Sequence, residues 1–93
     1  MIRHMVMFRW KEGVDGTHVA ATQAALSQLP VQIPQIAAYS YGPDLGLAPT
    51  TLDFGITALF ESLDDFVVYR DHPDHQAFIQ TYVTPFVAER IAV

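Results

Sequence analysis

The first ten positions have the composition of a β-strand that carries apolar residues on both of its faces. In MIRHMVMFRW the even positions share one face of the strand and the odd positions share the other. Both faces are largely apolar, with Ile2, His4, Val6, Phe8 and Trp10 on one and Met1, Arg3, Met5, Met7 and Arg9 on the other. The strand therefore has apolar surface to bury on both sides.

A helix is predicted from about residue 16 to 29. Asp15 can cap its N-terminus, and Pro30 and Pro34 are expected to stop it. The inward side of this helix is made of small residues and leucines: Ala20, Ala21, Ala24, Ala25, Leu26 and Leu29.

Two more strands and a short helix follow. Residues 36–42 and 53–61 have strand-like patterns, and the turn-rich segment GPDLGLAP lies between them. Ser62 is suited to cap a short helix that ends at Asp71 and His72.

Pro73 is well placed to begin the next helix, because its missing N–H costs nothing in a first turn. This helix has an apolar stripe at helical spacing: His75, Phe78, Ile79, Tyr82, Val83 and Phe86. Pro85 should kink or end it, and the final residues ERIAV are typical of a short last strand.

The resulting order, β-α-β-β-α-α-β, predicts a single α+β domain over residues 1–93 with a ferredoxin-like fold. In this fold an antiparallel sheet carries helices on one face only. Met5, Met7 and Leu59 would lie on the bare face and form an apolar patch that is large for a monomer. We therefore expect a homodimer in which two bare faces close on each other.

Composition limits the partners and the compartment. The formal charge is −5, with ten acidic residues against five basic ones and no basic run, so nucleic acid is not expected to bind. The absence of cysteine excludes disulfides and thiolate chemistry, and it is consistent with a reducing cytoplasm. No apolar stretch approaches the roughly 18 residues of a membrane helix, and no signal peptide or membrane partner is expected.

The segment YRDHPDHQAF contains two of the four histidines, at the joint between two predicted helices. The helix N-terminus disfavours a charged His75, which would keep this ring neutral near pH 7, as a general base requires. His4 is expected to point from the first strand toward the helices, so that the two rings share one cavity with Tyr69 nearby. Apolar residues would line this pocket: Val6, Phe8, Phe78, Ile79 and Tyr82.

Several of these features together resemble the stress-responsive dimeric α/β-barrel domain family over residues 2–93: His4 to Phe8, FES at 60–62, Tyr69, and the HPDH run at 72–75 followed by Phe78. The resemblance implies a ferredoxin-like protomer in a homodimeric barrel, in a family whose members mostly have no assigned activity. One characterised member is a plant polyketide cyclase that closes a ring by an aldol reaction without metal or cofactor. By position, its two histidines fall on His75 and His4, and its active-site tyrosine falls on Tyr69.

These residues predict a cofactor-independent cyclase, lyase or isomerase that acts on a small, apolar carbonyl compound. His75 would remove a proton next to the carbonyl, while Tyr69 and His4 donate hydrogen bonds to the oxygen that becomes negative. The resemblance also implies a substrate different from that of the cyclase, because aromatic residues of its first helix are replaced here by Thr22, Gln23 and Leu26.

Other interpretations stay open. A histidine on an apolar stripe is often a core residue with satisfied hydrogen bonds, and His72 is expected to cap a helix or contact solvent. His72 and His75, with Asp71 and Asp74, could hold a metal, but the sequence places no further ligand, and Trp10 alone does not supply a haem-degrading site. The second function considered is a non-catalytic dimer that binds a small ligand or has a structural role in stress. An open cleft would favour the enzyme, and a filled space would favour the structural role.

Overall fold

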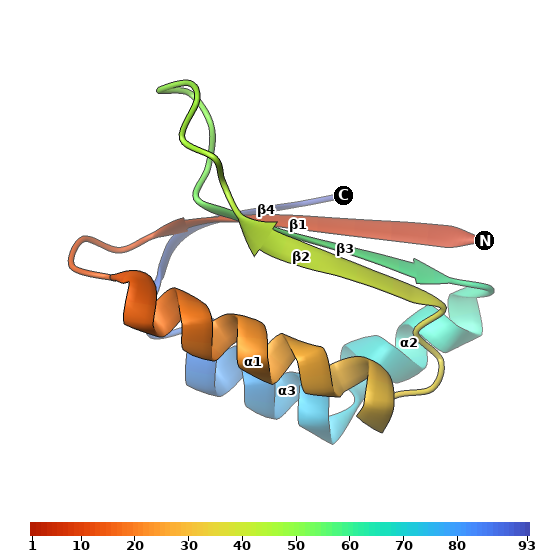
Figure 1. The fold of residues 1–93 in the computed structure, drawn as a ribbon. Coiled ribbons are helices and arrows are strands. Elements are labelled where there is room, and N and C mark those ends of the chain that lie inside the picture. Colours follow the sequence, from red (N-terminus) through yellow and green to blue (C-terminus); the bar gives the residue numbers. More distant parts are fainter.

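The computed structural model describes residues 1–93 and has the predicted order of elements. In chain order they are β1 (Ile2–Trp10), α1 (Gly16–Gln32), β2 (Ala38–Pro43), β3 (Phe54–Phe60), α2 (Leu63–Asp71), α3 (Pro73–Phe78), the π-helix η1 (Ile79–Val83) and β4 (Val87–Ala92). The strands form one antiparallel sheet in the order β2-β3-β1-β4. All helices lie on one side of this sheet, which confirms the ferredoxin-like α+β fold (Figure 1).

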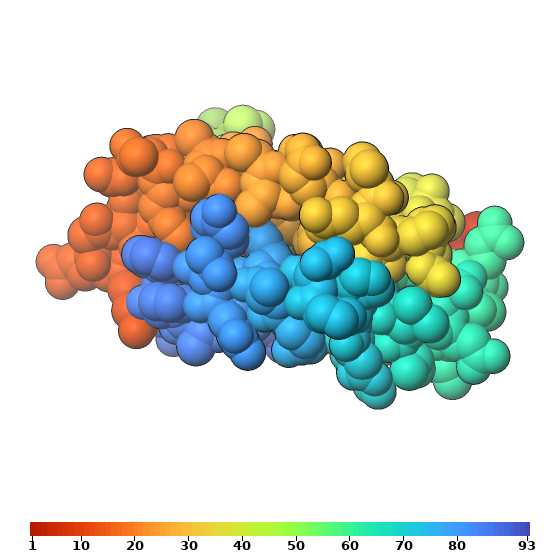
Figure 2. All heavy atoms as spheres, turned by 90° about the horizontal axis from the view of Figure 1, so that it is seen from below, coloured from red at the N-terminus to blue at the C-terminus, as the bar shows by residue number.

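The helix-covered face of the sheet contains the core. Strand β1 pairs with β3 so that Val6 lies opposite Ile56 and Phe8 opposite Phe54, and all four side chains are buried. Helix α1 covers them with Leu26, and it lies beside α3 and η1 when the molecule is seen from the helix side (Figure 2). The alternation seen in the first ten residues therefore sorts the sheet into a buried face and an open face.

Helix α1 extends further than expected. The prediction that Pro30 stops it was wrong, since the helix continues to Gln32. Proline removes one N–H from the helix, but the following residues can still donate, and the N–H of Ile33 bonds to the Leu29 carbonyl at 2.8 Å. The helix ends before Pro34, because the residue preceding a proline favours an extended backbone, as Ile33 adopts here.

The helix predicted from Pro73 changes its winding halfway. After six α-helical residues, the segment Ile79–Val83 forms a π-helix, and the N–H of Thr84 bonds to the Ile79 carbonyl at 2.9 Å. A π-turn holds more residues than an α-turn, so side chains beyond it are rotated relative to the predicted stripe.

The open face of the sheet carries apolar side chains without cover. Met5 is 37% exposed, Met7 is 39% exposed and Ile91 is 45% exposed. The β2–β3 loop extends to the same side, away from the helices, and presents Leu45 and Leu47 (Figure 1). No helix has the length and hydrophobicity that a membrane crossing requires.

Candidate active site

A cavity of about 240 Å³ lies between the sheet and the α2–α3–η1 segment. Residues from β1, β3, β4 and these helices line it: His4, Val6, Phe8, Ile56, Tyr69, His75, Phe78, Ile79, Val83, Thr84, Val87 and Arg90. Eight of these twelve residues are hydrophobic. The other four are polar or charged and can orient a ligand in an otherwise apolar cavity: His4, His75, Thr84 and Arg90.

His75 is held in place by the end of helix α2. The last carbonyls of a helix have no intrahelical partner, and the Arg70 carbonyl accepts hydrogen bonds from the His75 ring, 3.2 Å from Nδ1, and from Gln76 Nε2 at 2.6 Å. Because a carbonyl only accepts, Nδ1 carries the ring proton. The other nitrogen, Nε2, is then the basic atom of a neutral His75, and no hydrogen bond within the protein occupies it.

His75 and Tyr69 are stacked, with ring centroids 4.0 Å apart. The Tyr69 hydroxyl lies 2.9 Å from the hydroxyl of Tyr39, which comes from β2. Burial raises the pKa of both tyrosines, so both stay protonated at neutral pH. Each phenol is thus a hydrogen-bond donor rather than a base.

Burial is the largest cause that lowers the pKa of His75 below its ordinary value of 6.5, and the nearby His4 lowers it further. The hydrogen bond to the Arg70 carbonyl acts in the opposite direction without reversing the shift. Burial and the positive charge of Arg90 likewise lower the pKa of His4. Both imidazoles are therefore neutral near pH 7. For His75, the sequence analysis expected the helix N-terminus to keep the ring neutral, whereas burial is the main cause.

The structure brings together most of the residues that the sequence singled out. His4, Tyr69 and His75 all line the cavity, as do four of the five expected pocket residues. Tyr82 is the exception, and its assignment to the pocket was wrong. Tyr82 stacks on Phe78 and lines a surface groove toward helix α1 with Ala25 and Leu29, whereas Val83, four residues after Ile79, lines the cavity.

Sequence reasoning missed two polar residues of this region. Arg90 lines the cavity from β4, opposite Phe8 in the strand pairing, and the buried Phe8 marks that face as the helix-covered one. Tyr39 reaches Tyr69 from β2, opposite Ala58. Strand alternation signals both positions, but only once the register between strands is known.

His72 has a structural position. Its Nδ1 accepts a hydrogen bond from the Asp74 N–H at 3.1 Å and caps helix α3. His72 and His75 thus each use a ring nitrogen on a different backbone group, and they do not converge. No cluster of three or more histidine and carboxylate side chains is arranged to hold a metal ion.

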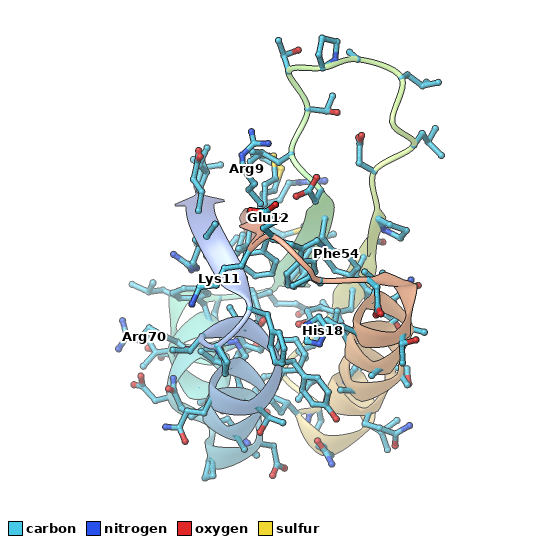
Figure 3. All side chains as sticks on the ribbon, turned by 90° about the vertical axis from the view of Figure 1, so that its left-hand side faces the viewer. Arg9, Lys11, Glu12, His18, Phe54 and Arg70 are labelled. Carbon is cyan, nitrogen blue, oxygen red and sulfur yellow. The ribbon has the colours of Figure 1, made fainter.

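His18 occupies the other end of the helix-covered face. It points from α1 into the space beside η1 (Figure 3), and its Nε2 lies 3.1 Å from the Tyr82 carbonyl and 3.3 Å from the Thr22 hydroxyl. Its ring packs on Phe86 at a centroid distance of 3.8 Å and meets Trp10 edge-on at 5.2 Å. This histidine joins α1 to the end of η1.

Comparison with known proteins agrees with this architecture. The model of the stress responsive A/B barrel domain matches residues 2–93. An uncharacterised protein of Streptomyces coelicolor is 33% identical over 79 residues, which cover 83% of this chain and 81% of that protein. A dimeric ferredoxin-like protein of unknown function from Thermobifida fusca superposes with a TM-score of 0.90 at 42% identity, over 98% of this chain and 85% of the other. A hydroxynitrile lyase from Passiflora edulis shares the fold, with a TM-score of 0.84 at 20% identity over 98% and 87% of the two chains.

Proposed function

The chain belongs to the stress responsive A/B barrel domain family, and on that basis we propose that it is a cofactor-independent acid–base enzyme acting on a small, apolar carbonyl compound. The observation that carries the proposal is the state of His75. Its ring is neutral, its tautomer is fixed by the Arg70 carbonyl, and its free Nε2 belongs to a ring that lines a largely apolar cavity. A general base needs a lone pair and a fixed orientation, and the contacts of His75 support both.

The proposed step is removal of a proton from the carbon next to the carbonyl. The C–H bond breaks, the proton moves to His75 Nε2, and the electron pair moves onto the carbonyl oxygen as an enolate. The Tyr69 hydroxyl, with Tyr39 donating to it, keeps its own proton for a hydrogen bond to that oxygen, and His4 is the second donor. The enolate then takes a proton back at another position, expels a leaving group from the adjacent carbon, or attacks a second carbonyl, which gives an isomerase, a lyase or a cyclase respectively.

The fold accommodates such chemistry, since the Passiflora edulis protein is a lyase with the same architecture. The cavity also favours an enzyme or a ligand-binding protein over a purely structural role, because its space is open rather than filled. Proton exchange of a bound ketone distinguishes an enzyme from a protein that only binds the ligand.

The test is hydrogen exchange of a ketone in D₂O, followed by proton NMR. Benzoylpropionate and its methyl ester serve as probes, since both have a ketone with exchangeable neighbouring protons. We expect the protein to accelerate exchange and His75→Gln to slow it by about 10²- to 10⁴-fold, because a positioned base typically contributes that much. His72→Asn is the matched control: it changes a histidine three positions away, keeps a capping side chain and should retain the rate.

Exchange that continues at the wild-type rate in His75→Gln contradicts the base assignment. Binding of the probes without any exchange, in a correctly folded wild-type protein, favours the non-catalytic ligand-binding function.

The proposal includes assembly as a homodimer through the open face of the sheet. The Thermobifida fusca relative, 42% identical, is dimeric. The exposed Met5, Met7 and Ile91 form the apolar centre of that face in this chain, and such a patch on a small protein favours burial against a partner.

Sedimentation velocity at micromolar concentration should give a dimer for the wild-type protein. Met7→Asp should shift it toward the monomer, because a buried, unpaired carboxylate would lie in the contact. Ala20→Asp is the control and should stay dimeric, because Ala20, which was expected on the inward side of α1, is exposed. A wild-type monomer at this concentration would contradict this assembly.

A further inference from the structure

Arg90 is the one cationic side chain of the cavity wall, and it has no anionic partner. The chain forms three ion pairs, and none of them includes Arg90. No hydrogen bond from the Arg90 side chain to another protein group is present either. A guanidinium has five N–H donors, so Arg90 retains its full capacity to bind a ligand.

The position of Arg90 is fixed by the sheet rather than by a mobile loop. It lies on β4 opposite Phe8, whose side chain is buried on the helix-covered face. The neighbours Glu89 and Ile91 fall on the opposite, open face, where Glu89 pairs with Arg9 at 3.7 Å. Alternation thus separates Arg90 from the nearest carboxylate along its own strand.

The charge of Arg90 acts on the same groups as the proposed chemistry. It contributes to the lowered pKa of His4 and of His75, and it also favours the ionised form of Tyr69. Arg90 and these rings line the same cavity, so one molecule bound there can contact the guanidinium and the rings together.

We propose that the cavity takes a carboxylate-bearing ketone, with Arg90 holding the carboxylate while the ketone lies against His75. This inference rests on the proposed function and names the class of its substrate. A planar guanidinium matches a carboxylate with two parallel hydrogen bonds, and the apolar walls suit the carbon skeleton between the two ends. Since the chain as a whole has a net charge of −5, attraction of an anion has to be local, and Arg90 supplies it.

The experiment compares binding of benzoylpropionate with that of its neutral methyl ester, by chemical-shift titration of the dimer. We expect the acid to bind about two- to fivefold more tightly than the ester, the gain typical of a partly exposed charged pair. Arg90→Gln should remove this preference by weakening the acid alone, and Arg90→Lys should keep part of it. Lys11→Gln removes the same charge at the end of β1, outside the cavity, and should leave the preference unchanged (Figure 3).

Equal affinity for acid and ester in the wild-type protein overturns the inference, as does a preference that survives Arg90→Gln or a complete absence of acid binding. Dissociation of the dimer by Arg90→Gln also overturns it, because the side chain would then serve the contact between subunits. His75→Gln separates this inference from the proposed function: a variant that keeps the acid preference while losing exchange supports both. If the wild-type protein prefers the acid but catalyses no exchange, the result supports the carboxylate site and contradicts the assignment of His75 as the base.

Discussion

The two ends of the helix-covered face each contain a histidine bonded to a backbone carbonyl, yet their surroundings differ. At the end that contains Trp10, His18, Thr22 and Phe86, the ring of His18 is packed on two aromatic side chains and its Nε2 has two acceptors. A surface pocket with mostly polar and charged lining borders this ring. At the cavity, His75 stacks on Tyr69 alone, its Nδ1 is bonded and its Nε2 has no protein partner.

The difference teaches that the anchored nitrogen does not determine what a histidine does. Both rings are fixed by a helix-end carbonyl, which holds the tautomer and the orientation. In each ring the other nitrogen has no hydrogen-bond partner within the protein, so the surroundings of the ring make the difference. His18 connects α1 to η1 and is packed among aromatic rings, whereas His75 lines a largely apolar cavity beside His4 and Tyr69.

The contrast predicts that the same substitution lowers stability by different amounts at the two positions. His18→Ala should lower the free energy of unfolding by about 2 kcal/mol, because it removes a packed ring and leaves the Tyr82 carbonyl without its donor. His75→Ala should cost about 1 kcal/mol or less. Its carbonyl keeps the hydrogen bond from Gln76, and the lost ring enlarges a cavity that already exists.

Urea unfolding of the two variants measures the difference, and proton exchange of benzoylpropionate measures function in the same samples. We expect His18→Ala to retain the exchange rate per folded molecule and His75→Ala to lose it. Equal losses of stability would contradict the distinction between the packed ring of His18 and the ring of His75, which lines a cavity.

The main residues of the candidate site could be predicted from the sequence. The period-two alternation of β1 places His4 on the helix-covered face, and the family pattern places Tyr69 and His75 near it. Local signals were sufficient there, because strand alternation and a proline at a first helical turn depend only on neighbouring residues.

The remainder depended on contacts between distant segments. The π-helix includes a hydrogen bond from the Thr84 N–H to the Ile79 carbonyl, and no sequence period indicates it. Tyr82 was placed in the pocket because the apolar stripe does not distinguish the side that faces the cavity from the side that faces α1. Arg90 was missed because the register of β4 against β1 fixes its face, and that pairing is shifted between Arg9 and Trp10. His18 was not singled out, since its partners Tyr82 and Phe86 are more than sixty residues away in the chain.

The smallest expected effect concerns pH, and it sharpens the account of the cavity. The pKa of His75 in the folded protein lies below 6.5, so the basic form dominates at and above pH 6.5 and the exchange rate should be flat there. Below the folded pKa the rate should fall by about tenfold per pH unit, as the base becomes protonated. Arg90→Gln should move this acid limb upward toward pH 6.5, because the charge of Arg90 is one of the causes that lower the pKa of His75.

The free energy of unfolding should also decrease as the pH falls below 6.5. Between the folded pKa values of His4 and His75 and the ordinary value of 6.5, the unfolded chain binds more protons than the folded one. The contribution of the two neutral rings is therefore complete above pH 6.5 and is lost as pH falls through the folded pKa values. Urea midpoints measured from pH 7.5 down to pH 5 should decline less steeply in the double variant His4→Asn/His75→Asn than in the wild-type protein. A parallel decline in both would mean that burial does not keep these rings neutral, and it would remove the physical basis for His75 as a base.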